Sequence, residues 1–127
     1  MYTMEKGKKG EQLAAEYLSR AGYNIILTNY HTKFGEIDII SRNDKYIVFV
    51  EVKTYRRGSM LRPAESVNIY KQKRIIKTAC KYILDNNIKI QPRFDVLEIL
   101  VNNDDFSVVE INHIKNAFCQ EEEYAAF

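Results

Sequence analysis

Residues 35–54 read GEIDIISRNDKYIVFVEVKT, and this stretch decides the fold. Residues 35–41 and 46–54 are rich in β-branched and aromatic side chains, which favour strands. Residues 42–45 (RNDK) have the composition of a turn, so the two runs are expected to form an antiparallel hairpin. The second run is apolar on both faces until it reaches Glu51, which is typical of a central strand covered on both sides.

A carboxylate and an ammonium share one face near the end of this second strand. Side chains alternate along a strand, so Glu51 and Lys53 point to the same side. Charge at the end of a buried strand is costly to desolvate unless it is paired or binds a metal. An ion pair between Glu51 and Lys53 is therefore one interpretation, and a metal site is the other.

The hairpin brings a second carboxylate, Asp38, to this face. If Arg42 pairs with Lys45, Asp38 becomes the diagonal neighbour of Glu51. A shift of the register by two residues sets Asp38 directly opposite Glu51. Either register keeps Asp38 and Glu36 on the face of Glu51, whereas a shift by one residue would separate them. Opposed carboxylates repel unless a cation lies between them, and this favours a metal.

Asp38, Glu51 and Lys53 together supply the groups needed to cleave a phosphodiester. Asp38 and Glu51 are the expected metal ligands, and their oxygens suit Mg²⁺ or Mn²⁺ with waters completing the octahedron. Such an ion lowers the pKa of a bound water and neutralises charge on phosphoryl oxygens. Lys53 would orient the attacking water or stabilise the developing negative charge.

A third carboxylate, Glu11, lies near the start of the first expected helix, residues 5–21. It extends the apolar stripe that contains Ala14 and Leu18, and Gly10 precedes it. From this place Glu11 would reach the carboxylate cluster or bind a second metal. The alternative is an acid that is favourable near a helix N-terminus. The sequence leaves both interpretations open.

The remaining segments complete a single α/β domain. The other expected elements are strands at residues 23–30, 93–101 and 106–114 and a helix at about residues 68–84. The order helix, three strands, helix, two strands predicts an α/β sandwich, in which helices pack on a central mixed sheet. The domain would span residues 1–118, and residues 119–127 would be an acidic, frayed tail.

Length and composition restrict the class of protein. The 127 residues, 46% hydrophobic and 28% charged, fit one globular domain with one core. The sequence has no apolar signal segment and no run near the roughly 20 apolar residues that span a bilayer, so no membrane contact is expected. Cys80 and Cys119 are too few for a disulfide framework, and a cytoplasmic protein is expected.

Basic residues are concentrated between Lys53 and Lys81, directly after the carboxylate cluster. This segment holds nine lysines and arginines and one acid, a net charge of +8, whereas the rest of the chain carries −6. It would attract a polyanion, although a solvated helix face next to a loop gives the same pattern. The candidate nucleic-acid contacts are Arg56, Arg57, Lys71, Gln72, Lys73, Arg74 and Lys77. We expect them to recognise the backbone and shape of the nucleic acid rather than its bases.

Four further polar residues have a weaker pattern. Arg93 and Asp95 share a face of the strand at residues 93–101, where they would brace the site or simply pair with each other. His113 and His31 lack metal-ligand spacing, and no role is assigned to them.

Six motifs occur in order along nearly the whole chain. They are GxxGExxA (7–14), GEIDII (35–40), VFVEVK (48–53), KQxR (71–74), RFDV (93–96) and HIKNAF (113–118). The chain thereby resembles the YraN-like family, small bacterial proteins of the PD-(D/E)XK restriction-endonuclease-like superfamily. The resemblance implies a restriction-endonuclease-like fold with Asp38, Glu51 and Lys53 at the metal-binding and catalytic positions. Glu11 matches the helical glutamate of archaeal Holliday-junction resolvases, and Ile37 departs from the proline in the superfamily motif's name.

We therefore expect a metal-dependent endonuclease that hydrolyses DNA phosphodiester bonds, with branched and flapped DNA as candidate substrates. The alternative is a non-catalytic nucleic-acid-binding module with the same fold. A third hypothesis is a scaffold that recruits a partner through an apolar patch of Ile114, Ala117 and Phe118. The sequence leaves open whether the protein is a monomer or a homodimer.

Overall fold

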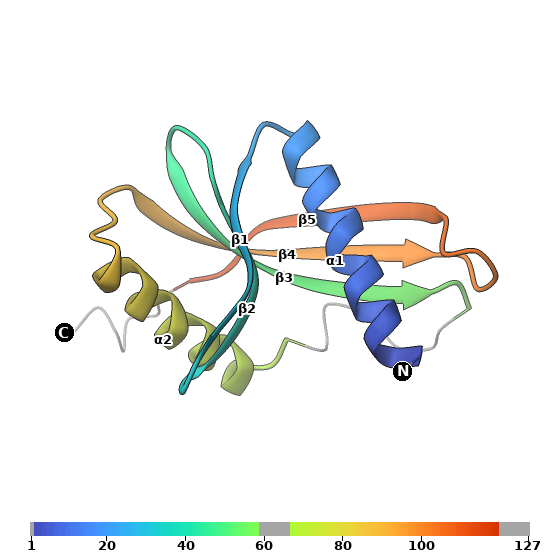
Figure 1. The fold of residues 1–127 in the computed structure, drawn as a ribbon, viewed down its shortest axis with the longest axis horizontal. Helices are drawn as coiled ribbons and strands as arrows, with labels where there is room; N and C mark the ends of the chain where they lie inside the picture. Colours follow the sequence, from blue (N-terminus) through green and yellow to red (C-terminus); the bar gives the residue numbers. More distant parts are fainter. Residues whose placement is uncertain (1, 59–66, 120–127) are drawn as a thin grey trace.

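The protein is a five-stranded mixed sheet between two helices in a computed structural model that describes residues 2–58 and 67–119, with side chains from residue 8 onward (Figure 1). The elements are α1 (Tyr2–Arg20), β1 (Asn24–Thr32), β2 (Gly35–Arg42), β3 (Tyr46–Arg56), α2 (Ile69–Asp85), β4 (Gln91–Val101) and β5 (Val108–Phe118). The expected order of elements and the α/β class are confirmed. The expected acidic tail lies, apart from Cys119, outside the described residues.

The strands lie in the sheet in the order of the chain, β1-β2-β3-β4-β5. All neighbouring strands are antiparallel except β3 and β4, which are parallel along their whole length. A parallel pair needs a crossover, and the connection that contains α2 provides it. β3 is thus the central strand, as its two apolar faces indicate.

Each helix covers one face of the sheet and has its own apolar cluster. The cluster between α2 and the sheet contains the buried residues Ile37, Ile40, Ile47, Phe49, Val67, Ile75, Ile76, Ala79, Tyr82, Phe94, Val96 and Phe118. Under α1 lie Ala14, Leu18, Tyr23, Ile39, Val48, Val50, Leu97, Ile99 and Val101. Burying one large apolar side chain contributes about 1.5–3 kcal/mol, so both faces of β3 stabilise the fold.

The ends of α1 and β5 have identifiable causes. α1 stops at Gly22, whose φ of 96° favours glycine, and the Tyr23 amide donates to the Leu18 carbonyl (3.0 Å). β5 runs four residues beyond the expected end at residue 114. A bulge at Asn116 (φ 53°) allows this extension, because the Asn116 amide donates to the Asp95 carboxylate (2.9 Å) and the strand then resumes pairing.

Candidate active site where β2 leaves β3

The hairpin takes the second of the two registers considered for it. Arg42 pairs with Ile47 and Ile39 pairs with Val50, and the same register sets Asp38 opposite Glu51. The pairing of Arg42 with Lys45 is wrong. Asn43 explains the difference, because its side chain accepts hydrogen bonds from the amides of residues 45 and 46 (2.9 Å each) and holds them in the turn.

β2 separates from β3 at the position of Asp38. The two strands stop pairing at Ile39 and Val50, although β2 begins at Gly35 and β3 continues to Arg56. Asp38 bridges the opening, since its Oδ2 accepts a hydrogen bond from the Val52 amide (2.8 Å). A carboxylate is therefore held by backbone at the point where the sheet opens.

Asp38 and Glu51 are hydrogen-bonded to each other in this opening. Burial, the charge of Glu51 and that hydrogen bond raise the pKa of Asp38 to about 8. Burial also acts to raise the pKa of Glu51, but hydrogen bonds from Asp38 and Lys71 outweigh it and the pKa is lowered. At neutral pH Asp38 therefore carries the proton and Glu51 the negative charge.

Two ammonium groups converge on the same oxygen of Glu51. The Lys53 Nζ lies 3.3 Å from Glu51 Oε2, and the Lys71 Nζ forms an ion pair with that oxygen from α2. Burial and the neighbouring Lys71 lower the pKa of Lys53. Burial opposes protonation of Lys71 too, yet its bonds to Glu51 raise its pKa. The expectation that Lys53 shares a face with Glu51 is confirmed, and the ion pair is present.

Glu11 reaches this site from the other side of the sheet. The pKa of Glu11 is raised, chiefly by burial and also by the charges of Glu36 and Glu51. A hydrogen bond with Asn29 acts in the opposite direction but does not cancel this effect. Its charge also contributes to the raised pKa of Asp38. The structure thus brings Glu11 close enough to the two carboxylates for their charges to interact.

A close helix–strand contact positions Glu11. Gly10 is buried, and a Cβ at this residue would lie 2.0 Å from Oγ1 and 3.2 Å from Cβ of Thr54. Only a residue without a side chain allows α1 to approach β3 this closely. Gly10 therefore places the next residue, Glu11, at the edge of the site.

The site has limited capacity for a metal. Within residues 2–58 and 67–119, no group of three or more His, Cys, Asp or Glu side chains is arranged to hold an ion by itself. Two opposed carboxylates that share a proton are nevertheless a suitable pair of oxygen ligands for Mg²⁺ or Mn²⁺, which keep several waters. Asp38 and Glu51 fit such an ion, and Glu11 would have to move to join them.

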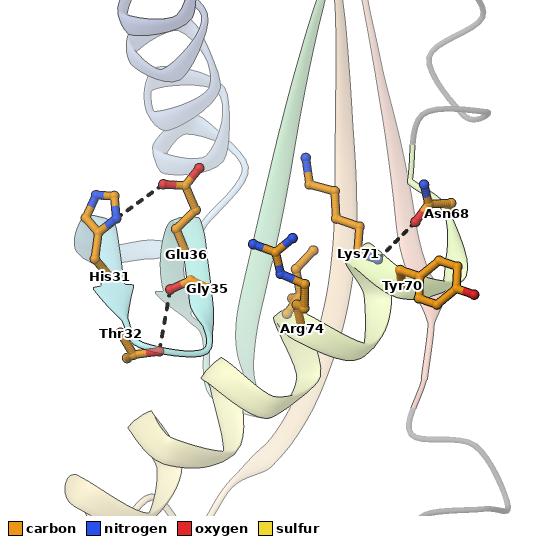
Figure 2. Close-up of a pocket in the computed structure, with 9 residues that line it drawn as sticks. His31, Thr32, Gly35, Glu36, Asn68, Tyr70, Lys71 and Arg74 are labelled. Carbon is orange, nitrogen blue, oxygen red and sulfur yellow. Dashed lines mark hydrogen bonds and ion pairs between the residues drawn. The ribbon is translucent and has the colours of Figure 1, made fainter.

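A groove of about 630 Å³ lies beside the site, between the tip of the β1–β2 hairpin and the first turns of α2. Figure 2 shows Glu36 and His31 on the hairpin side, 3.2 Å apart, and Arg74 and Lys71 on the helix side. Its lining residues are His31, Thr32, Gly35, Glu36, Asn68, Tyr70, Lys71, Arg74 and Ile75. The groove has the size of a ligand cleft, and one of its walls is basic.

The expected basic residues do not all meet at this groove. Lys71 and Arg74 line it, and Lys77 lies 4.9 Å from the Phe34 ring at the hairpin tip. Gln72 is instead engaged in structure, because its side-chain amide donates to the Val67 carbonyl (3.0 Å). Lys73 is exposed on α2.

Arg56 and Arg57 lie away from the groove, at the far end of β3. Arg56 lies five positions along the strand from Glu51, a span of about 17 Å. The Arg57 backbone is tied to the β4–β5 connection by the Val101 carbonyl (2.9 Å) and the Asn103 side chain (3.2 Å). These two arginines therefore belong to a different part of the surface.

Sequence reasoning missed Tyr70, which lines the groove with a side chain that projects from the first turn of α2 (Figure 2). The residue is 77% exposed, far more than is usual for an aromatic side chain. Exposure on a helix was not visible in the sequence, because Tyr70 adjoins the apolar stripe of α2.

Arg93 and Asp95 do not brace the site. They form an ion pair (2.8 Å) on the face covered by α1, opposite to the face of Glu51. Asp95 also contacts His113 Nε2 (2.6 Å), and His113 Nδ1 lies 3.2 Å from the Tyr17 hydroxyl. His113, to which no role was assigned, is thus part of a buried polar network that ties β4 and β5 to α1.

The apolar patch expected near the end of β5 does not exist as a patch. Phe118 is buried and stacks on Phe94 with a ring-centroid distance of 5.3 Å. Ile114 packs against the same core cluster, and only Ala117 is exposed. The HIKNAF segment therefore closes the core under α2.

The sequence of the chain matches that of a known family. The profile of a family described as "Uncharacterised protein family UPF0102" matches residues 10–99, which include Glu11, Asp38, Glu51 and Lys53. The chain belongs to family UPF0102. This confirms the resemblance to the YraN-like family.

Individual UPF0102 proteins match over almost their whole length. The chain is 45% identical over 113 residues to one from Caldanaerobacter subterraneus subsp. tengcongensis, covering 88% of this chain and 93% of that protein. One from Persephonella marina is 44% identical over 119 residues, with coverage of 93% and 97%. One from Clostridioides difficile is also 44% identical over 119 residues, with coverage of 93% and 100%.

Among the residues that the structure describes, no helix combines the length and the apolar character that crossing a membrane requires.

Proposed function

We propose that this UPF0102 protein is a metal-dependent endonuclease of the PD-(D/E)XK, restriction-endonuclease-like superfamily, which hydrolyses phosphodiester bonds of DNA. One observation supports this most strongly. Asp38 and Glu51 face each other in the opening between β2 and β3 and are hydrogen-bonded to each other, with Lys53 on the same side. Opposed carboxylates repel each other when both are ionised, and a divalent cation between them would remove this repulsion.

Asp38 and Glu51 would hold Mg²⁺ or Mn²⁺, with waters and a substrate phosphate at the other positions. When bound, the ion would supply Lewis acidity for phosphoryl oxygens and activate water. Asp38 needs to lose its proton for this, and the positive charge of the ion would lower its pKa of about 8.

Lys53 would act on the attacking water. Burial and the nearby Lys71 lower its pKa, so its amine exchanges a proton more readily than a solvated lysine does. Its attachment to the rigid central strand, 3.3 Å from Glu51, fixes its place relative to the ligands. Glu11 would assist from the opening between the strands.

The groove beside the site would bind the DNA backbone. Lys71 and Arg74 supply positive charge, and the exposed Tyr70 ring offers a surface on which an unpaired base can stack. This arrangement favours branched or flapped DNA, in which bases near the cleaved bond are unpaired.

One observation favours the alternative, a non-catalytic nucleic-acid-binding module of the same fold. Lys53 and Lys71 already neutralise Glu51, and Asp38 is protonated. A site balanced in this way is stable without a metal, and only its basic groove would then serve function.

A cleavage assay with matched variants separates these two functions. Junction, flap, single-stranded and duplex DNA would each be incubated with Mn²⁺ or Mg²⁺. Lys53→Met should lower the cleavage rate by about 10²–10³-fold, as expected for loss of a group that stabilises developing charge, while Mn²⁺ binding persists. Asp38→Asn should abolish both, because it removes a ligand but keeps the acceptor for Val52.

Asp85→Asn is the control, because Asp85 is an exposed carboxylate of α2 that pairs with Lys81. Cleavage that is equal in the wild type, Lys53→Met and Asp38→Asn would refute the assignment of the site. Binding of DNA without cleavage of any substrate, and without Mn²⁺ binding, would establish the module instead.

A further inference from the structure

Lys71 has an unusual place for a residue of a basic helix. It projects from the first turn of α2 toward the sheet and pairs with Glu51, whose side chain is only 6% exposed. In Figure 2 its side chain extends along the groove, away from the Tyr70 ring. A cation from another element is thereby brought onto one of the two expected metal ligands.

The same oxygen, Glu51 Oε2, already has Lys53 as a partner. Two ammonium groups on one carboxylate oxygen repel each other, and the single negative charge of Glu51 has to hold both. Lys71 thus lies where a divalent cation would have its most favourable interactions.

The two lysines differ in how easily their ammonium groups can move away from Glu51. Lys53 is on the central strand, two residues from Glu51, and its side chain is 20% exposed. Lys71 is 39% exposed and borders the open groove. Its flexible four-carbon stem allows the ammonium to move into the groove without any change in the backbone.

We propose that Lys71 is a built-in substitute for the metal ion: its ammonium occupies the cation position at Glu51 in the metal-free protein and is displaced into the groove when Mg²⁺ or Mn²⁺ binds. The inference rests on the proposed metal site and adds a competitor to it. With both carboxylates ionised, the ion and both lysines would leave the site with a large excess of positive charge. Departure of Lys71 removes part of this excess.

The displaced ammonium has a second consequence. In the groove Lys71 lies beside Arg74, where a DNA phosphate would neutralise it. Metal binding therefore makes an additional cation available to the nucleic acid, and by linkage the nucleic acid strengthens metal binding by the same factor. The site would acquire its metal and its substrate together.

Calorimetric titration with Mn²⁺ alone tests this competition. The Lys71→Met protein should bind Mn²⁺ more tightly than the wild type, by at least the fivefold that is the low end of coupling between sites. Lys81→Met is the matched control, because Lys81 is on the same helix but pairs with Asp85 (2.9 Å). It should bind Mn²⁺ as the wild type does.

Thermal unfolding in a chelator gives an independent readout that needs no activity. Without metal, Lys71→Met should melt at a lower temperature than the wild type, because Glu51 loses a partner. Mn²⁺ should raise its melting temperature more than that of the wild type. Lys71→Gln, which retains a polar side chain, serves for both measurements if the methionine variant does not fold.

The outcomes distinguish this inference from the proposed function. Equal or weaker Mn²⁺ binding by both Lys71 variants, with normal binding by the wild type, would overturn the inference and leave the metal site intact. No Mn²⁺ binding by the wild type or any variant would overturn the metal site itself, and the inference with it. Tighter binding that is confined to the Lys71 variants would support it.

Discussion

The Asp38 carboxyl group donates a hydrogen bond to the Glu51 carboxylate across the opening between β2 and β3. This contact exists because the hairpin register sets the two residues opposite each other, and because burial leaves one proton shared between them. The pair is consequently sensitive to anything that removes the proton or replaces it with a cation.

The first prediction is that metal-free protein loses stability as the pH rises toward about 8. The pKa of Asp38 is raised to about 8 from an ordinary value of 3.8, so the folded state holds a proton that the unfolded state releases. Its stabilising contribution is complete below about pH 4 and is lost as the pH rises through the folded pKa. The lowered pKa of Glu51 acts only at acidic pH, outside this range.

Melting temperatures in a chelator at about pH 6 and about pH 9.5 would measure this loss. Between these two pH values the unfolding free energy of the wild type should fall by at least about 1 kcal/mol more than that of Asp38→Asn, which cannot ionise. This lower bound is less than the free energy of a shift of one pKa unit. Added Mn²⁺ should remove the difference in stability between the two pH values in the wild type, and it should have no such effect on Asp38→Asn. Parallel pH profiles of the two proteins would show that Asp38 has an ordinary pKa.

Strand alternation alone identified the face of the site, because any register with the correct parity gathers Asp38, Glu51 and Lys53. The exact opposition of the carboxylates was not predictable to the same degree. It depends on the Asn43 side chain, which captures two amides of the turn and moves the pairing by two residues. A turn of this composition can form several alternative sets of local side-chain hydrogen bonds, so the sequence does not show which set forms.

The second prediction concerns Gly10 and Thr54. Gly10→Ala should destabilise the protein, because the new Cβ would lie 2.0 Å from Thr54 Oγ1. Overpacking costs about 1–3 kcal/mol, whereas alanine in a helix gains only about 1 kcal/mol over glycine. The shift of α1 should also move Glu11 from the site.

Urea denaturation of a double-mutant cycle would measure this effect. Thr54→Ala removes the hydroxyl that clashes, so Gly10→Ala should cost less in that background than in the wild type. Additive changes in the free energy of unfolding would mean that the two residues do not touch.

The third prediction separates stability from the site. Asp95 is fully buried and holds both Arg93 and His113 on the face under α1. Asp95→Ala should destabilise the protein by about 3–5 kcal/mol, since it leaves buried partners without their anion. The milder Asp95→Asn should retain part of this stability.

Mn²⁺ affinity of the folded Asp95→Asn protein should equal that of the wild type, because the network lies across the sheet from Glu51. Calorimetry at a temperature well below its melting point would measure this. A large loss of Mn²⁺ affinity would mean that Arg93 and Asp95 brace the site after all.

The contribution of Lys71 shows what sequence patterns do not predict. Its place in the first turn of α2 is readable from the sequence, but its contact with Glu51 depends on how the helix crosses β3. The place of Lys71 in the first turn indicates that it could lie nearer the site than the later lysines, but it does not show a contact with Glu51. Tertiary packing makes one basic residue part of the site and leaves its neighbours exposed.

The fourth prediction is that the groove binds the nucleic-acid backbone through Arg74. Arg74 lines the wall opposite Glu36, and each phosphate contact releases condensed counterions. Arg74→Gln should therefore weaken DNA binding by a similar factor for all sequences and reduce the slope of log affinity against log salt by about 1. Arg20→Gln, at the end of α1, is the control for loss of one positive charge.

Fluorescence anisotropy with a labelled flap substrate in a chelator, over a series of salt concentrations, would give both slopes. Glu36→Gln should instead strengthen DNA binding, because it removes negative charge from the wall that faces Arg74. Equal slopes for the wild type and Arg74→Gln, together with a reduced slope for Arg20→Gln, would place the DNA on α1 instead. Opposite effects at Arg74 and Glu36 would locate the backbone between the hairpin and α2.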